Sequence, residues 1–175
     1  MVHYRRNRVP GASYFFTVAL EDRSSRLLVD SIDCFRRAYA TMLYQYPVRT
    51  IAIAILPDHL HAIWKLPEAD ADYSARWRAL KSMFVRDLRK SGLEIPINGK
   101  GEAAVWQRRF WEHTIRDDND LRTHIGYVHW NPVKHGHARR VRDWPYSSFH
   151  RYVRNGEIAN DWGGGSIDQR GTSGE

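Results

Sequence analysis

Two neighbouring apolar stretches, separated by Pro57-Asp58, constrain the fold of this chain more than any other feature. Residues 48–56 alternate isoleucine with smaller residues, and residues 59–66 form a second apolar run. Alternation with a period of two is typical of a strand that buries one face, and Pro-Asp is a turn signal. The sequence therefore predicts an antiparallel hairpin made of residues 48–56 and 59–66.

The second stretch of this hairpin carries two histidines, His59 and His61. Side chains alternate across a strand, so both imidazoles should face the same side. Two convergent neutral imidazoles are half of a divalent metal site. The alternative is a purely structural role, in which both histidines make ordinary hydrogen bonds within the protein.

Spacing alone is weak evidence for a metal site. With nine histidines in 175 residues, chance gives roughly half of one His-x-His. A second pair occurs at His135 and His137, beside a glycine in a polar stretch typical of a loop or helix end. The apolar strand around His59 and His61 is what distinguishes the first pair.

The order of the remaining predicted elements indicates an α+β fold. Helical spacing of apolar residues predicts helices, and aromatic or branched runs predict strands. In chain order we expect a strand over 14–20, a helix over 31–46, the hairpin, a helix over 73–90, a strand over 104–115 and a helix that begins near Asp117. This order matches a ferredoxin-like plait, an antiparallel sheet with helices over one face. The two histidines would then lie on an inner strand.

The chain is long enough for one hydrophobic core. Its 42% hydrophobic content, with 13% aromatic residues, is ample for burial. We expect a single domain over residues 1–153, followed by a flexible polar tail over residues 154–175 that is Gly-rich from Gly163 onward.

The net charge of +7 favours a polyanionic partner, with nucleic acid as the first choice. A merely solvated basic surface is the alternative. Arginine neutralises phosphate and also reads guanine, so clustered arginines are candidate DNA contacts. The candidate nucleic-acid-binding residues are Arg5, Arg6, Arg8, Arg108, Arg109 and Lys134.

Several classes of protein do not fit the sequence. The single cysteine, Cys34, provides neither a disulfide framework nor a thiolate zinc site. No apolar run approaches the roughly twenty residues of a membrane span, and the charged N-terminus is not a secretion signal. No metalloprotease motif or Gly-rich phosphate loop is present. We expect a cytoplasmic protein with no organic cofactor.

Tyr127 and Asn131 suggest how the histidines could be used. On a helix these residues are four apart and share a face, with His124 one turn earlier. An Asn131 oxygen would complete a His/His/Asn set suited to Mg²⁺ or Mn²⁺ and a phosphate oxygen. The Tyr127 hydroxyl could then attack a phosphodiester, with solvent, the metal environment, His124 or Lys134 as possible proton acceptors.

These two residues also have structural interpretations. Tyr127 could be an ordinary core tyrosine. Asparagine followed by proline is a common helix start, so the helix could kink or begin again at Asn131-Pro132.

Taken together, four motifs resemble those of the REP-associated tyrosine transposases, which belong to the single-tyrosine group of the HUH endonuclease superfamily. The motifs are Tyr14-Phe15-Phe16-Thr17, Leu56-Pro57-Asp58-His59-Leu60-His61, Phe110-Trp111-Glu112-His113 and Tyr127-Val128-His129-Trp130-Asn131-Pro132-Val133-Lys134-His135-Gly136. The resemblance runs from about Tyr4 to Tyr152.

The resemblance implies His59 and His61 as the metal pair, Asn131 as the polar residue that assists the metal, and Tyr127 as the nucleophile. It also implies the ferredoxin-like fold and a Mg²⁺ or Mn²⁺ requirement. The expected reaction is cleavage and joining of single-stranded DNA at repetitive extragenic palindromic (REP) hairpins through a 5′-phosphotyrosine. Members of the family are typically monomers, and bacterial nucleoid DNA is the expected place of action.

A different class of function fits many of the same residues. A noncatalytic protein that binds hairpin DNA or RNA could use this plait with structural histidines. It would bind nucleic acid in a salt-sensitive way without metal-dependent cleavage.

Overall fold

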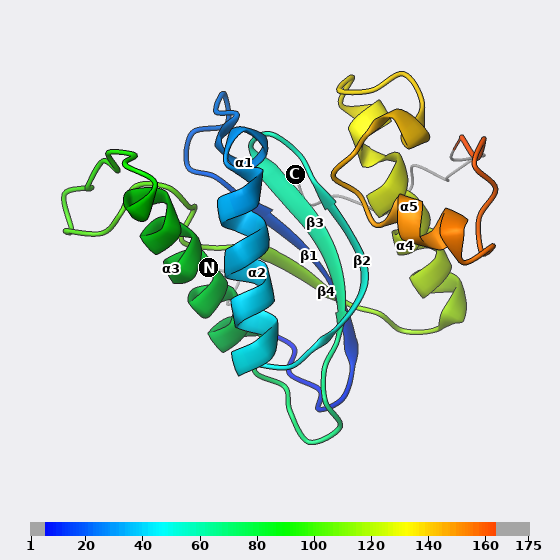
Figure 1. Cartoon of the computed structure of the whole chain (residues 1–175). Helices are drawn as coiled ribbons and strands as arrows, with labels where there is room; N and C mark the ends of the chain where they lie inside the picture. Colours follow the sequence, from blue (N-terminus) through cyan, green and yellow to red (C-terminus); the bar gives the residue numbers. More distant parts are fainter. Residues whose placement is uncertain (1–5, 164–175) are drawn as a thin grey trace, which may run out of the picture.

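A four-stranded antiparallel sheet is the framework of the protein. The computed structural model describes residues 6–163. The strands are β1 (Ser13–Ala19), β2 (Arg49–Ile55), β3 (His59–Lys65) and β4 (Trp111–Thr114), in the spatial order β2-β3-β1-β4 (Figure 1). The helices are α1 (Leu27–Asp30), α2 (Ile32–Gln45), α3 (Tyr73–Lys90), α4 (Asp118–Lys134) and α5 (Phe149–Arg154), with a 3-10 turn η1 (Val141–Asp143).

The strand order confirms the α+β, ferredoxin-like prediction. The chain runs β1-α2-β2-β3-α3-β4, with α1 as one short turn before α2. The two crossing helices allow β1 and β3 to lie side by side at the centre of the sheet. The predicted hairpin forms β2 and β3, joined by a turn at Pro57-Asp58. His59 and His61 therefore lie on an inner strand, as predicted.

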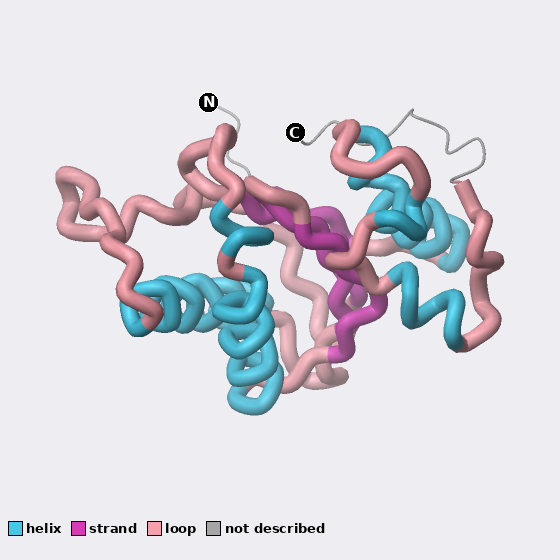
Figure 2. Tube along the Cα trace, turned by 45° about the horizontal axis from the view of Figure 1, so that its top comes forward, coloured by secondary structure: helices cyan, strands magenta, loops and turns pink. Residues whose placement is uncertain are grey.

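Helices cover both faces of the sheet, and the prediction of helices over one face was wrong in this respect. Helices α2 and α3 lie on one side, whereas α4 lies on the other (Figures 1 and 2). The physical reason is that β1 and β3 have large apolar side chains on both sides, such as Phe16 on one side and Phe15 and Ile63 on the other, so each side of the sheet needs a cover. We call the two sides the α2/α3 face and the α4 face.

The α2/α3 face contains the larger hydrophobic core, with many aromatic rings from the sheet and from α3. Trp64 of β3 stacks on Trp77 of α3 with ring centroids 4.0 Å apart, and Phe16 of β1 packs 5.3 Å from Trp77. The Trp64 indole N–H donates to the Tyr39 hydroxyl of α2 at 2.8 Å. This core fixes the position of β3 within the sheet.

The hydrophobic core on the α4 face is smaller, and its packing depends on small side chains in β2. Ala52 and Ala54 are fully buried there, beside Phe15 of β1 and Ile63 of β3. Alanine occupies little space, so α4 can approach β2 and β3 closely. The residues that α4 presents to this core include Tyr127, so the close approach brings the helix directly over the sheet.

One predicted strand needs correction. The strand expected over 104–115 is limited to β4, and Trp106 makes only an isolated bridge with Leu20. The exposed pair Arg108-Arg109 separates these two pieces and interrupts the alternation that a strand requires.

Helix α4 neither ends nor restarts at Asn131-Pro132. It contains Pro132 and ends at Lys134, with His135 as C-cap. Its N-cap is Asp117, whose side chain accepts a hydrogen bond from the Asp120 N–H at 2.8 Å. Tyr127 and Asn131 are therefore on one continuous helix.

The last described part of the chain includes α5 and the residues that follow it up to Gly163. Trp162 lies with its ring centroid 6.2 Å from that of Phe149 in α5. The flexible tail was predicted over residues 154–175. Arg154 is instead the last residue of α5, and residues 164–175 of the predicted tail lie outside the described residues. Within residues 6–163, none of the helices is both long and apolar enough to cross a bilayer.

Candidate active site

The strand β3 points His59 and His61 toward α4, because side chains alternate and Leu60 between them points to the other face. Each imidazole uses its Nδ1 atom within the protein. His59 Nδ1 donates to Asp58 Oδ1 at 2.8 Å, and His61 Nδ1 shares a hydrogen bond with Thr17 Oγ1 at 2.9 Å. Both Nε2 atoms are buried and have no hydrogen-bond partner among the described residues.

Burial keeps these imidazoles in their neutral form. It lowers the pKa of His59, although the neighbouring Asp58 carboxylate opposes this effect. Burial lowers the pKa of His61 well below its ordinary value, and the repulsion that a protonated His59 would exert adds to this lowering. The nearby Asn131 amide acts in the opposite direction. Neutral imidazole is the form that binds a metal ion through its free nitrogen.

Asp58 is itself held in place by Arg23, whose Nε donates to Asp58 Oδ2 at 2.6 Å. Burial alone would raise the pKa of Asp58, but the hydrogen bonds from Arg23 and His59 outweigh it and leave that pKa lowered. The carboxylate therefore stays ionised and orients the His59 ring. Partners of this kind typically fix the tautomer of a metal-binding histidine.

Helix α4 brings Tyr127 and Asn131 to the same place. The Tyr127 ring centroid lies 5.3 Å from that of His61, and the two histidine rings are 5.0 Å apart. Asn131 is fully buried beside His61, and its side-chain oxygen and nitrogen make no hydrogen bond of regular geometry with any described residue. The structure thus brings together all four residues singled out from the sequence.

Two residues at the end of α4 complete this group. Lys134 Nζ donates to the Tyr127 hydroxyl at 3.3 Å and lies 5.0 Å from the centre of that ring. The His135 ring is 5.1 Å from the His59 ring. The sequence argument set His135 aside as part of a loop. Its position four residues after Asn131 could have identified it, because such residues share a helix face.

A second polar group, His113, Asp120 and His124, lies where β4 meets the start of α4. His113 Nε2 donates to Asp120 Oδ2 at 2.8 Å, and His124 Nδ1 lies 3.1 Å from Asp120 Oδ1. One ligand atom from each residue lies within 4.8 Å of the others, so the group could hold a metal ion.

Both carboxylate oxygens of Asp120 in this group already have partners within the protein. Asp120 Oδ2 also accepts from the Arg116 backbone N–H at 2.9 Å. Burial would raise the pKa of Asp120, but the hydrogen bonds from His113 and Arg116 outweigh it and lower that pKa. The ring of Phe15 lies 4.9 Å from His124 and 5.7 Å from Tyr127. The group therefore ties β4 to α4 one turn before Tyr127.

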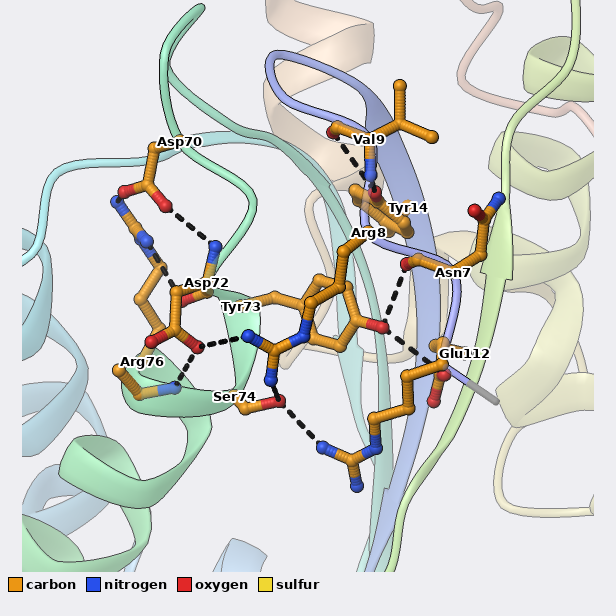
Figure 3. A network of polar contacts seen from close by, with 12 residues as sticks. Asn7, Arg8, Val9, Tyr14, Asp70, Asp72, Tyr73, Ser74, Arg76 and Glu112 are labelled. Atoms are coloured by element: carbon orange, nitrogen blue, oxygen red, sulfur yellow. Dashed lines mark hydrogen bonds and ion pairs between the residues drawn. The ribbon is translucent and has the colours of Figure 1, made fainter. Parts of the chain in front are cut away.

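The predicted DNA contacts near the N-terminus lie on the α3 side of the sheet. Arg6 donates to Ser74 at 2.6 Å and covers the Phe110 ring at 4.3 Å. Figure 3 shows the neighbouring contacts, in which the Tyr73 hydroxyl reaches the Asn7 carbonyl and Arg8 lies beside Asp72 and Ser74. Arg5 lies outside the described residues.

The remaining predicted DNA contacts are divided between the two sides. Arg108 and Arg109 are exposed in the segment before β4, and Arg108 lies 4.0 Å from Glu102. Lys134, in contrast, is on the α4 face beside Tyr127. The basic residues named from the sequence thus form at least two separate surfaces.

Comparisons with known proteins place the chain in one family. None of the protein-family models that were searched matches it. A Haemophilus influenzae protein assigned to the REP-associated tyrosine transposases is 49% identical over 166 residues, which cover 94% of each chain. The REP-associated tyrosine transposase of Escherichia coli is 41% identical over 168 residues, which cover 96% of this chain and 94% of that one.

A solved structure agrees with these relatives. It is that of a REP-associated tyrosine transposase bound to a REP hairpin, and it matches with a TM-score of 0.87 and 40% sequence identity. The match covers 100% of this chain and 98% of the other. The chain therefore belongs to the REP-associated tyrosine transposase family.

Proposed function

We propose that the protein is a metal-dependent single-stranded DNA endonuclease and strand transferase that acts on REP hairpins through a covalent 5′-phosphotyrosine. The observation that carries this proposal is the meeting of His59, His61, Tyr127 and Asn131 on the α4 face. Family membership and the hairpin-bound relative support the DNA substrate. On this proposal the protein works as a monomer on chromosomal DNA in the bacterial cytoplasm.

The donor atoms of the site fit a divalent metal ion. The Nε2 atoms of His59 and His61 and the Asn131 side chain are buried polar groups without partners, which is costly unless something binds them. Two imidazole nitrogens and one amide oxygen would leave positions open for phosphate oxygens, as Mg²⁺ or Mn²⁺ requires. When bound, the metal would supply Lewis-acid activation of the scissile phosphate.

Tyr127 would provide the attacking oxygen. Its hydroxyl oxygen forms a bond to phosphorus, and the bond to the 3′ oxygen of the preceding nucleotide breaks and releases a free 3′ end. The phenolic proton leaves as the bond forms, and the 3′ oxygen gains a proton as it departs. A 3′ hydroxyl from another strand can reverse this exchange, so the phosphodiester is rejoined without hydrolysis.

Lys134 is placed to assist this exchange. Its ammonium group donates a hydrogen bond to the Tyr127 oxygen, so it stabilises negative charge there both when the tyrosine loses its proton and when it leaves. His124 also stays a candidate proton acceptor, because its Nδ1–H donates to the Asp120 carbonyl oxygen at 2.8 Å and its Nε2 is then the nitrogen that can take up a proton.

The test is formation of a covalent protein–DNA adduct. A labelled REP hairpin with a single-stranded flank is incubated with the protein and Mn²⁺, and the products are separated under denaturing conditions. We expect an adduct with the wild type, no adduct with Tyr127→Phe, and none for the wild type in a chelator. Tyr152→Phe is the matched control and should still react, because the Tyr152 hydroxyl is bonded to the Ile51 carbonyl away from the site.

The noncatalytic alternative gives the opposite result. A protein that only binds hairpins would retain DNA in a chelator and form no adduct with any divalent metal. An adduct that forms equally well with Tyr127→Phe would also contradict the proposed nucleophile.

A further inference from the structure

The two histidines of the α4 face occupy different places in the sheet. His61 lies inside the ladder between β1 and β3, opposite Thr17, whose hydroxyl shares a hydrogen bond with its Nδ1 at 2.9 Å. His59 is instead the first residue of β3, and it lies opposite Ala19, the last residue of β1. Alanine has no polar group to offer, and the ends of elements are held less firmly than their centres. The orientation of the His59 ring therefore needs support from outside the sheet.

Three hydrogen bonds from the segment that follows β1 hold the turn that precedes β3. The Leu20 N–H donates to the Asp58 carbonyl at 2.8 Å, and the Leu28 N–H of α1 donates to the Pro57 carbonyl at 3.1 Å. Arg23 supplies the third bond with its side chain, because its Nε donates to Asp58 Oδ2 at 2.6 Å. Both the backbone and the carboxylate of Asp58 are thus held by the connection between β1 and α1.

The loop that carries Arg23 is itself folded by local hydrogen bonds. Asp22 Oδ1 accepts from the Ser24 N–H at 2.9 Å and from the Ser24 hydroxyl at 2.6 Å. The Ser25 N–H donates to the Asp22 carbonyl at 3.2 Å. Aspartate side chains that bond the backbone two residues ahead stabilise turns. Arg23 therefore extends from a formed turn, although its own side chain is 45% exposed.

Asp58 uses its two carboxylate oxygens for different partners. Oδ2 accepts from Arg23, and Oδ1 accepts from His59 Nδ1 at 2.8 Å. A carboxylate is planar, so holding Oδ2 also fixes the direction of Oδ1. An ionised carboxylate only accepts, so the proton of the neutral His59 ring is on Nδ1. The buried Nε2, which has no hydrogen-bond partner among the described residues, keeps its lone pair for a metal ion.

We propose that Arg23 is a positioning residue of the metal site, which acts through Asp58 to keep His59 Nε2 directed at the ion. The inference rests on the proposed function, because the ion belongs to that function. Groups that orient a metal-binding histidine from behind typically change metal affinity by roughly 10- to 100-fold. The loop between β1 and α1 is then part of the support of the candidate active site.

The charge of Arg23 allows positioning to be separated from electrostatics by the sign of an effect. A guanidinium repels a divalent cation, so loss of the charge alone should strengthen metal binding. Loss of the hydrogen bond should weaken metal binding, because the Asp58 carboxylate could then rotate and release the His59 ring. Solvent screens the charge effect, since the Arg23 side chain is 45% exposed. We therefore expect the loss of positioning to dominate.

The test measures Mn²⁺ binding rather than cleavage. The full chain with Tyr127→Phe, the parent protein, is bound to a REP hairpin so that no reaction occurs. Mn²⁺ is then added, and the free ion is quantified by electron paramagnetic resonance. His59→Ala/His61→Ala in the same background gives the amount of Mn²⁺ that the DNA and the rest of the protein bind. The difference between these two titrations is the Mn²⁺ bound at the site.

Arg23→Met in the parent should bind Mn²⁺ about tenfold more weakly, with unchanged hairpin affinity. Arg23→Lys keeps a charged donor and should restore most of the Mn²⁺ affinity. Arg26→Met is the matched control, because Arg26 carries the same charge on the same connection but pairs with Asp30 at 3.7 Å. This control should bind Mn²⁺ as the parent does.

A second pair of variants tests whether Arg23 acts through Asp58. Asp58→Ala should itself weaken Mn²⁺ binding by about tenfold or more, because it removes the partner of His59 Nδ1. In that background Arg23→Met should cause no further loss, since the group that it positions is gone. A further tenfold loss would show that Arg23 affects the protein by another route and would overturn the inference.

The remaining outcomes separate the inference from the proposed function. If the parent binds no more Mn²⁺ than His59→Ala/His61→Ala, the proposed metal site is wrong and the inference is overturned with it. If the parent binds Mn²⁺ and Arg23→Met binds it equally well or more tightly, the positioning role is wrong while the proposed function stands. An equal loss of affinity in Arg26→Met would also overturn the inference.

Discussion

The two faces of the sheet are built from the same strands but differ in what they bury. The α2/α3 face packs rings such as Trp64, Trp77 and Phe16 into one large apolar core. Its unpartnered buried atoms include the N–H groups of Trp77 and Trp106, which have no lone pair to offer a metal. The α4 face gathers unpartnered atoms of His59, His61 and Asn131 in one place.

We therefore expect the α2/α3 face to contribute mainly to stability and the α4 face to carry the proposed reaction. An unpartnered buried polar group costs about 1–3 kcal/mol, and the α4 face collects several such groups around Tyr127. The α2/α3 face can compensate for this cost because its aromatic core is larger. The neighbouring residues Leu60 and His61, which point to opposite faces, allow the comparison to be tested within one strand.

The largest expected effect is that of His61→Ala on DNA cleavage. Loss of one metal ligand should reduce the single-turnover cleavage rate by roughly 1000-fold, equivalent to about 4 kcal/mol, while hairpin binding remains. The rate is measured with labelled hairpin and excess protein in Mn²⁺. Cleavage within tenfold of the wild-type rate would show that His61 is not required for the reaction, and would contradict a catalytic role for the α4 face.

Leu60→Ala should produce the complementary result. Leu60 is fully buried on the α2/α3 face, and its truncation should lower the free energy of unfolding by about 3 kcal/mol. Urea denaturation measures this change. At a temperature where the variant is folded, its adduct should form at close to the wild-type rate. A stable variant that cannot cleave would show that the two faces are not separable.

Asp120→Asn tests how α4 is held on its face. The substitution weakens the bonds from His113 and Arg116, and we expect a loss of about 2 kcal/mol in the free energy of unfolding. Asp143→Asn is the control, because Asp143 pairs with Arg140 at the surface and should change stability very little. Equal effects in urea denaturation would mean that the Asp120 network does not anchor α4.

Lys81→Met gives the smallest expected effect, and it depends on pH. Burial, with a contribution from the nearby Arg6 charge, lowers the pKa of Lys81 to about 8 from the ordinary 10.5. Between these values the unfolded chain binds more protons, so Lys81 makes wild-type stability rise with pH.

After solvent screening, this contribution should be about 1 kcal/mol between pH 7 and pH 10. Lys81→Met should lack it, which urea denaturation of both proteins at the two pH values would reveal. Parallel changes in the two proteins would show that Lys81 is not held in a desolvated position.

Much of the fold was predictable because it depends on local patterns. The alternation in β2 and β3 and the Pro57-Asp58 turn define a hairpin without any other part of the chain. The same alternation places the side chains of His61 and Leu60 on opposite faces of the sheet. Tyr127 and Asn131 led us to expect α4 beside the histidines, but the sequence did not reveal that this face is opposite α2 and α3, since nothing within 118–134 tells which side of the sheet the helix will cover.

The candidate site was predictable only in part. Helical spacing related Tyr127 to Asn131, and strand spacing related the two histidines. The partner of His61, Thr17, depends on the register between β1 and β3, which the sequence does not specify locally. The contact of the segment from Glu102 to Arg108 with α3 is not local either, and no pattern within that segment predicts it.

The most direct measurement of the central claim is the location of the covalent bond. After reaction with a REP hairpin in Mn²⁺, the protein is digested with nuclease and protease, and the nucleotide-bearing peptide is sequenced by mass spectrometry. We expect a nucleotide linked through its 5′ phosphate to Tyr127. A nucleotide on any other residue, or cleaved DNA with no modified peptide, would contradict the claim that the α4 face carries the chemistry.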